Sequence, residues 1–181
     1  MLGMLSRDNR VGDAALLGNL ERNVAFFASS TLLVLAGLVA ALGSGEDIVA
    51  VTENLPFTMA VNEHGWETKL LLLAVIFVYA FFKFSWSLRQ YGFASVLMGR
   101  APMPEELSEE AALQFSTQAA QVISRAAQAF NLGLRAYYFS LAYLIWFLNP
   151  WVFMLASATV VGVLYRREFR SRVLNALGRI V

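Results

Sequence analysis

Long runs of apolar residues, separated by short polar segments, dominate this chain. Residues 24–43 carry no charge, and a bilayer-crossing helix needs about 20 such residues. A second run begins at Lys69 and ends at Arg89. That separation is about 30 Å along a helix, which matches the thickness of a hydrocarbon core. The pattern therefore predicts membrane-crossing helices over residues 24–43 and 68–89.

The longest uncharged run, residues 136–165, is interrupted by Asn149 and Pro150. As one helix it would be about 45 Å long, well beyond the bilayer core. Proline removes a backbone donor and disfavours the helical conformation of the residue before it. We therefore predict a hairpin of two membrane-crossing helices, over residues 128–148 and 150–167, with a tight turn at Asn149-Pro150.

An amphipathic helix is predicted before the third span. Pro104 is followed by several glutamates, and both residue types are favoured at the start of a helix. Apolar residues then recur at helical spacing over residues 104–127, and only Gly133 weakens the continuation into the third span. We predict one long helix that extends from the membrane into the cytoplasm. Near the N-terminus, residues 13–22 fit either a short interfacial helix or a solvated tail.

The distribution of charge along the chain predicts its orientation. Arginines cluster at both ends of the chain and between residues 89 and 125, whereas residues 44–67 hold acidic residues and no lysine or arginine. The positive-inside rule places the arginine-rich segments in the cytoplasm, and the acidic loop and the Asn149-Pro150 turn outside. The predicted fold is an all-α polytopic bundle of four transmembrane helices, forming a single membrane domain over residues 1–181 in the inner (plasma) membrane.

Composition excludes several kinds of chemistry. The chain is 58% hydrophobic, contains no cysteine, and has one histidine, His64. Disulfides, thiolate metal sites and cysteine nucleophiles are excluded, and a lone histidine does not support a conventional zinc or haem site. We expect no metal, no cofactor and no enzymatic activity. The basic C-terminal tail is explained by topology and by attraction to anionic lipid, so nucleic-acid binding is not expected.

Three cations and a run of hydroxyl residues fall at a similar predicted depth, in the cytoplasmic leaflet. One interpretation is that the cations extend to the headgroups, as long basic side chains near an interface do. The other is an inward-facing site for an anion or a phospholipid headgroup. Because the acidic residues lie outside the spans, we expect no carboxylate to neutralise these cations. The site residues in the second interpretation are Lys83, Arg135, Arg166, Ser29, Ser30 and Thr31.

Two other groups of residues have structural and functional interpretations. His64 lies beside Glu63 and Glu67, and we expect an ordinary exposed histidine, with a loop metal site or a pH sensor as the alternative. Several aromatic residues of the hairpin are expected to pack between helices rather than to hold a cofactor. They are Tyr137, Tyr138, Phe139, Tyr143 and Phe147.

Several stretches spread over nearly the whole chain form a specific pattern: residues 6–10, 18–23, 26–37, 78–92, 131–139, 149–155 and 164–169. In these stretches the chain resembles a bacterial and plant family of uncharacterised membrane proteins, domain of unknown function 599. The resemblance implies a helical membrane fold and supplies no activity. Members usually carry a further hydrophobic helix upstream of Arg7–Arg10, so this chain is expected to be a shorter form or an internal start.

Three function classes follow. The favoured one is a structural or accessory membrane protein that packs with itself or with a larger membrane complex. The alternative is an oligomeric channel or transporter with the cationic site described above. A lipid-modifying enzyme is the weakest, because no nucleophile or general base is found at the depth of the cations. Membrane lipids, anionic phospholipid above all, are the expected partners.

Overall fold

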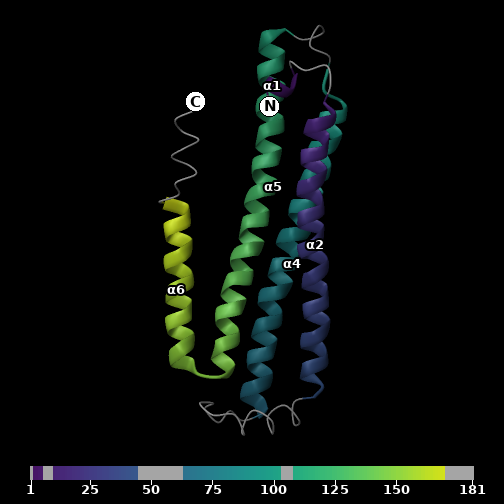
Figure 1. Ribbon diagram of the computed structural model, residues 1–181. Coiled ribbons are helices and arrows are strands. Elements are labelled where there is room, and N and C mark those ends of the chain that lie inside the picture. The colour runs from purple at the N-terminus through teal and green to yellow at the C-terminus, as the bar shows by residue number, and fades with distance from the viewer. Residues whose placement is uncertain (1, 6–9, 45–62, 103–107, 170–181) are drawn as a thin grey trace. The chain divides into compact units, whose positions relative to one another are not determined.

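The computed structural model of the chain describes residues 2–5, 10–44, 63–102 and 108–169. Regular secondary structure in these ranges is helical, which confirms the all-α class. The predicted helix start at Pro104, most of the acidic loop and the tail beyond Phe169 lie outside the described residues. The helices (Figure 1) are α1 (Leu2–Leu5), α2 (Val11–Leu42), α4 (Glu63–Gly99), α5 (Glu109–Leu144), the 3-10 helix η2 (Ile145–Phe147) and α6 (Pro150–Phe169).

The chain forms two compact units, each built from segments that are distant in sequence. The first unit comprises Met1–Leu35 and Val78–Leu134, and the second comprises Ala36–Phe77 and Arg135–Val181. Helices α2, α4 and α5 each contribute residues to both units. The single domain predicted over residues 1–181 stays a prediction.

Helix α2 is longer than the first predicted span. It begins at Val11 and includes residues 13–22, so the short helix predicted there forms the first turns of α2, and its position at the membrane interface stays a prediction. Asp13 lies in the first turn, where a negative charge is favoured by the helix dipole. The last turn tightens, with the Gly43 amide donating to the carbonyl of Ala40 at 3.1 Å.

Helix α4 also extends beyond its predicted span at both ends. It begins at Glu63, inside the segment predicted as loop, and continues to Gly99. Residues 92–99 are therefore continuous with the span. The helix ends before Pro102 because a residue that precedes proline is disfavoured in helical conformation.

Helix α5 runs through Gly133 without interruption, which confirms a continuous helix from Glu109 into the predicted third span. A Cβ atom on Gly133 would lie 2.5 Å from Cε1 of Phe84, inside van der Waals contact. Gly133 is therefore not a weak point in the helix. It is the position that lets α5 approach the aromatic ring of Phe84 on α4.

The predicted helix break at Asn149-Pro150 is confirmed. Helix α5 ends at Leu144, η2 follows, and α6 begins at Pro150. The side-chain Oδ1 of Asn149 accepts hydrogen bonds from the amides of Trp151, at 2.9 Å, and Val152, at 3.4 Å. Asn149 thus acts as the N-cap, and Pro150 occupies the first helical position, which has no need of an amide donor. Figure 1 shows α6 turning back after α5.

Aromatic rings from three helices form the core of the first unit. The ring of Phe27 on α2 stacks on Phe84 of α4, with centroids 5.5 Å apart, and meets Phe130 of α5 edge-on at the same distance. The rings of Phe84 and Phe130 complete the set at 5.7 Å. One helical turn along α4, the buried hydroxyl of Ser87 donates to the carbonyl of Ala126 at 2.7 Å. These contacts hold α2, α4 and α5 together in the first unit.

Two of the described helices, spanning Val11–Leu42 and His64–Gly99, are long and apolar enough to cross a membrane. They contain the first and second predicted spans, residues 24–43 and 68–89. The spans predicted over residues 128–148 and 150–167 correspond to helical segments, and their insertion into a membrane stays a prediction.

Candidate functional site

The residues of the predicted cationic site are divided between the two units. Lys83 and the three hydroxyl residues belong to the first unit, and Arg135 and Arg166 belong to the second.

Lys83 is half-buried and makes its contact on its own helix. Its Nζ lies 5.3 Å from the centroid of the Tyr79 ring, which is one turn earlier along α4, in a cation–π arrangement. Thr31 is fully buried, and its hydroxyl donates to the carbonyl of Phe27 at 2.6 Å. Of the other two hydroxyl residues, Ser29 is exposed and Ser30 half-buried. The Thr31 hydroxyl is thus engaged by its own helix.

Arg135 is neutralised by a carboxylate, which corrects the expectation that none would do so. Its Nη2 lies 2.7 Å from Oε2 of Glu168, and the two side chains are 40% and 51% exposed. Glu168 lies just after the predicted fourth span, and for that reason it was not considered as a partner for Arg135. Helix α6 returns beside the end of α5, and this brings together two residues 33 positions apart.

Arg166 and Arg167 are both exposed on α6, and Arg167 contacts a residue of α5. The Nη1 atom of Arg167 donates to the hydroxyl of Tyr138 at 3.4 Å. Arg167 was not among the site residues predicted from the sequence. Val152, Ala156, Val163 and Arg167 lie on one face of α6, because residues three and four positions apart are neighbours on a helix surface. This spacing could have indicated that Arg167 shares a face with the apolar residues that line α6.

A groove, here called the α5–α6 groove, lies between the end of α5 and α6 in the second unit. Its volume is about 590 Å³, and most of its walls are aliphatic. Arg167 and Tyr138 provide the main polar groups. The lining residues are Tyr138, Leu141, Ala142, Ile145, Val152, Leu155, Ala156, Thr159, Val160, Val163, Leu164 and Arg167.

Lys69 on α4 is bound to the segment that contains the end of α5 and η2. Its Nζ donates to the carbonyl of Trp146 at 3.1 Å and lies 5.2 Å from the centroid of that residue's ring. In return, the hydroxyl of Tyr143 donates to the carbonyl of Lys69 at 3.2 Å. Carbonyls at the end of a helix lack intrahelical partners, and a cation there is favoured by the helix dipole. Lys69 therefore acts as a cap for the end of α5 and η2.

Aromatic packing surrounds this cap. The ring of Phe147 meets that of Trp66 at 4.7 Å between centroids, and Trp146 stacks on Phe153 at 5.5 Å. Tyr137 contacts Phe77 at 5.2 Å, and Tyr143 contacts both Trp146 and Phe147. The predicted packing role is thus confirmed for Tyr137, Tyr143 and Phe147.

A second polar cluster, also missed from the sequence, lies in the first unit. The Arg10 guanidinium donates to the carbonyls of Ala101 and Pro102, each at 2.6 Å. A second contact joins the same two helices' segments, because the Ser95 hydroxyl of α4 donates to Oε1 of Glu21 on α2 at 2.6 Å. Because α4 ends just before Ala101, free carbonyls were to be expected there, but the sequence alone did not indicate which cation reaches them.

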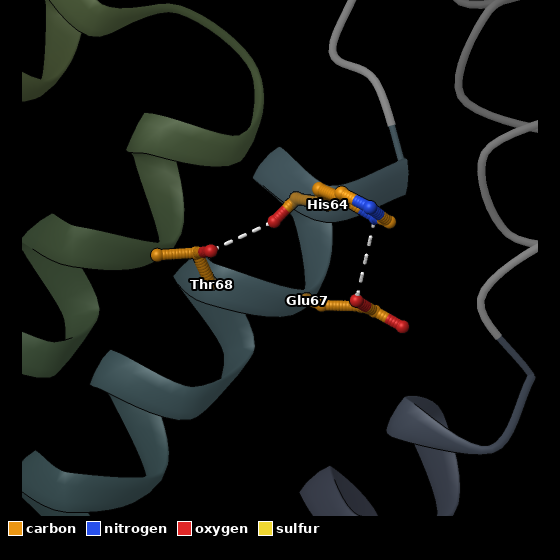
Figure 2. Close-up of polar contacts among 3 residues, drawn as sticks. All are labelled: His64, Glu67 and Thr68. Atoms are coloured by element: carbon orange, nitrogen blue, oxygen red, sulfur yellow. Dashed lines mark hydrogen bonds and ion pairs between the residues drawn. The ribbon is translucent and has the colours of Figure 1, made fainter.

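His64 is an exposed residue at the start of α4, as expected. Its side chain is 91% exposed, and its Nδ1 lies 3.8 Å from Oε2 of Glu67 on the next turn. Figure 2 shows this pair and the hydrogen bond from the Thr68 hydroxyl to the His64 carbonyl, at 2.7 Å. Among the described residues, no group of three or more potential metal-binding side chains gathers here or elsewhere.

Comparison with known proteins identifies a family and no further relative. The model of the family described as "Protein of unknown function, DUF599" matches residues 1–173. Neither a curated protein nor a solved structure matches the chain.

Proposed function

We propose that this chain, which belongs to the DUF599 family of proteins of unknown function, is a non-enzymatic multi-pass protein of the inner membrane. In this proposal it has a structural or accessory role and packs with itself or with a larger membrane complex. The four predicted spans cross the bilayer, with both chain ends in the cytoplasm.

The observation that carries the proposal is the exposure of many large apolar side chains in the first unit. Large apolar side chains point outward, as shown by Leu33, which is 75% exposed, and Phe82, which is 65% exposed. The small residues Ala80 and Ala126 are fully buried between the helices, together with the ring of Phe84. A water-soluble bundle places its large apolar residues inside, whereas membrane helices associate through small residues and leave large ones to lipid.

Helix α6 supports the accessory role in particular. None of its residues is buried, although it carries Trp151, Leu155 and Val163, which are all mostly exposed. Lipid around a membrane-inserted hairpin, or a neighbouring protein, would cover such a surface. The exposed apolar surface of α6 therefore suits a protein that functions by associating with other components of the membrane.

The test has two stages. Full-length protein expressed in bacterial cells should remain with the membrane fraction after an alkaline carbonate wash, and release into the soluble fraction would overturn the proposal. The mass of the protein is then measured in mild detergent. Co-purification with a defined set of membrane proteins supports the accessory role. A symmetric homo-oligomer that conducts ions in planar bilayers would instead favour the channel or transporter. Lys83 and Arg166 are then its candidate residues, since neither pairs with a carboxylate among the described residues.

A further inference from the structure

The α5–α6 groove has an apolar body and a cationic end. Its walls come from aliphatic residues such as Leu141, Val152 and Val160, and Arg167 and Tyr138 lie together at one end. This arrangement matches an amphiphile, whose hydrocarbon part needs an apolar surface and whose anionic part needs hydrogen-bond donors.

The groove is longer than one leaflet of a bilayer, so it can hold an acyl chain along its whole length. From Val152 to Arg167 the groove follows α6 for about 22 Å, whereas half of a hydrocarbon core is about 15 Å. If Pro150 lies near the outer interface, as the proposed function requires, Arg167 lies about 26 Å away along α6. That distance brings its guanidinium close to the inner headgroups, with the apolar walls extending from it into the bilayer.

The electrostatics of this end favour an anion. Glu168 is engaged with Arg135, and among the described residues no carboxylate lies within ion-pair distance of Arg167. The contact of Arg167 with Tyr138 is a single long hydrogen bond to a neutral group. A guanidinium carries five N–H donors in a fork that matches phosphate oxygens, so most of its donors remain for a ligand.

We propose that the α5–α6 groove binds an anionic glycerophospholipid. One acyl chain lies along the aliphatic walls, and the phosphate accepts hydrogen bonds from Arg167 and from the hydroxyl of Tyr138. The inference rests on the proposed membrane insertion, and it places lipid recognition at Arg167 rather than at Arg166 or Arg135.

Native mass spectrometry of the full-length protein tests the proposal. The protein is exchanged into mild detergent and titrated with dioleoyl phosphatidylglycerol, or with dioleoyl phosphatidylcholine, which has the same chains and no net charge. We expect one phosphatidylglycerol to be retained in preference to phosphatidylcholine. Equal retention of the two lipids would overturn the proposal.

Two neighbouring arginines provide a matched pair of variants. Arg167→Gln should weaken phosphatidylglycerol retention about fivefold, the typical contribution of one basic residue near an anionic lipid surface. Arg166→Gln removes the same charge at almost the same depth, but Arg166 does not line the groove. An equal loss in the two variants would indicate general attraction to the surface and would overturn a specific site.

Two neighbouring valines test the apolar part in the same way. Val160 lines the groove, whereas Val161 is 54% exposed and does not. Val160→Trp should fill the groove and abolish preferential lipid retention, and Val161→Trp, which adds the same volume, should leave it intact. Retention that is unaffected by Val160→Trp would contradict the proposal.

A second copy of the chain is the competing occupant of the groove. A protein that survives the carbonate wash but forms a lipid-free dimer, which Val160→Trp dissociates, would overturn lipid binding and leave the proposed membrane function standing. Release of the protein by the carbonate wash would instead overturn the proposed membrane function. The two experiments therefore distinguish a failure of lipid binding from a failure of membrane insertion.

Discussion

The backbone of Gly133 on α5 lies against the ring of Phe84 on α4, so closely that a Cβ atom at Gly133 would come within 2.5 Å of the ring. Phe84 is fully buried and also contacts the rings of Phe27 and Phe130. Because all three rings are mutually packed, Phe84 has little freedom to move away. Helix contact in the first unit therefore depends on the absence of a side chain at Gly133.

Gly133→Ala should lower the free energy of unfolding by about 1–3 kcal/mol, the usual cost of overpacking a filled core. Thermal unfolding in detergent, followed by circular dichroism, measures the change. Gly92→Ala is the matched control, because Gly92 also lies within a helix and a Cβ atom there would meet no side chain or neighbouring segment within 4 Å. The control should be neutral or slightly stabilising, since alanine is the better helix former. A control as destabilised as Gly133→Ala would contradict this explanation.

Lys69→Met should destabilise the hairpin end of the second unit. The substitution keeps the length and apolar stem of the side chain but removes its hydrogen bond to the Trp146 carbonyl and its cation–π contact. We expect a loss of about 1–2 kcal/mol, with a change in tryptophan fluorescence, because a helix-end carbonyl loses its partner. Lys83→Met, which removes an ammonium held only over Tyr79 on its own helix, should cost less. Equal losses would argue against a capping role for Lys69.

Arg10→Met should loosen the end of α4. The guanidinium satisfies the carbonyls of Ala101 and Pro102, and without it these acceptors lose a charged donor. Hydrogen–deuterium exchange should become faster in residues 96–101, because unsatisfied helix ends fray. Arg22→Met, in which the arginine contacts Asn19 on its own helix, should leave exchange in that segment unchanged.

The ion pair of Arg135 and Glu168 should contribute little to stability, because both side chains are substantially exposed. A double-mutant cycle with Arg135→Gln and Glu168→Gln should give a coupling energy of about 0.2–1 kcal/mol in detergent at low salt. The coupling should fall at 1 M salt, where the Debye length is about 3 Å. A coupling of several kcal/mol that is insensitive to salt would mean that the pair is shielded from solvent.

The fold was more predictable from the sequence than the site, for physical reasons. The all-α class and the break at Asn149-Pro150 follow from apolar run length and from proline geometry, which are local properties. Helix ends were less predictable: α4 begins at Glu63 because polar residues also continue a helix when no breaker intervenes. Gly133 looked like a weakness because its role depends on Phe84, which lies 49 positions away in sequence.

The candidate site depended on contacts between helices, which a single sequence does not determine. Counting residues from the turn gave the depth of Arg135 and Arg166 but not the direction of their side chains. Both arginines of α6 are exposed, and the rotation of α6 decides that Arg167, not Arg166, contacts Tyr138 and lines the groove. The return of α6 beside α5 likewise brings Glu168 to Arg135. Both contacts depend on which face of α6 packs against α5. The sequence indicated that face only weakly, through the helical spacing of a few apolar residues.

Labelling of single cysteines tests the four-span threading most directly, and the natural chain has no cysteine to interfere. Ser44→Cys, Glu110→Cys and Leu148→Cys place a thiol at exposed positions near three helix ends. In cells whose outer membrane is permeabilised, a membrane-impermeant maleimide should label Ser44→Cys and Leu148→Cys, and should label Glu110→Cys only after the inner membrane is opened. Labelling of Ser44→Cys and Glu110→Cys from the same side would contradict the account.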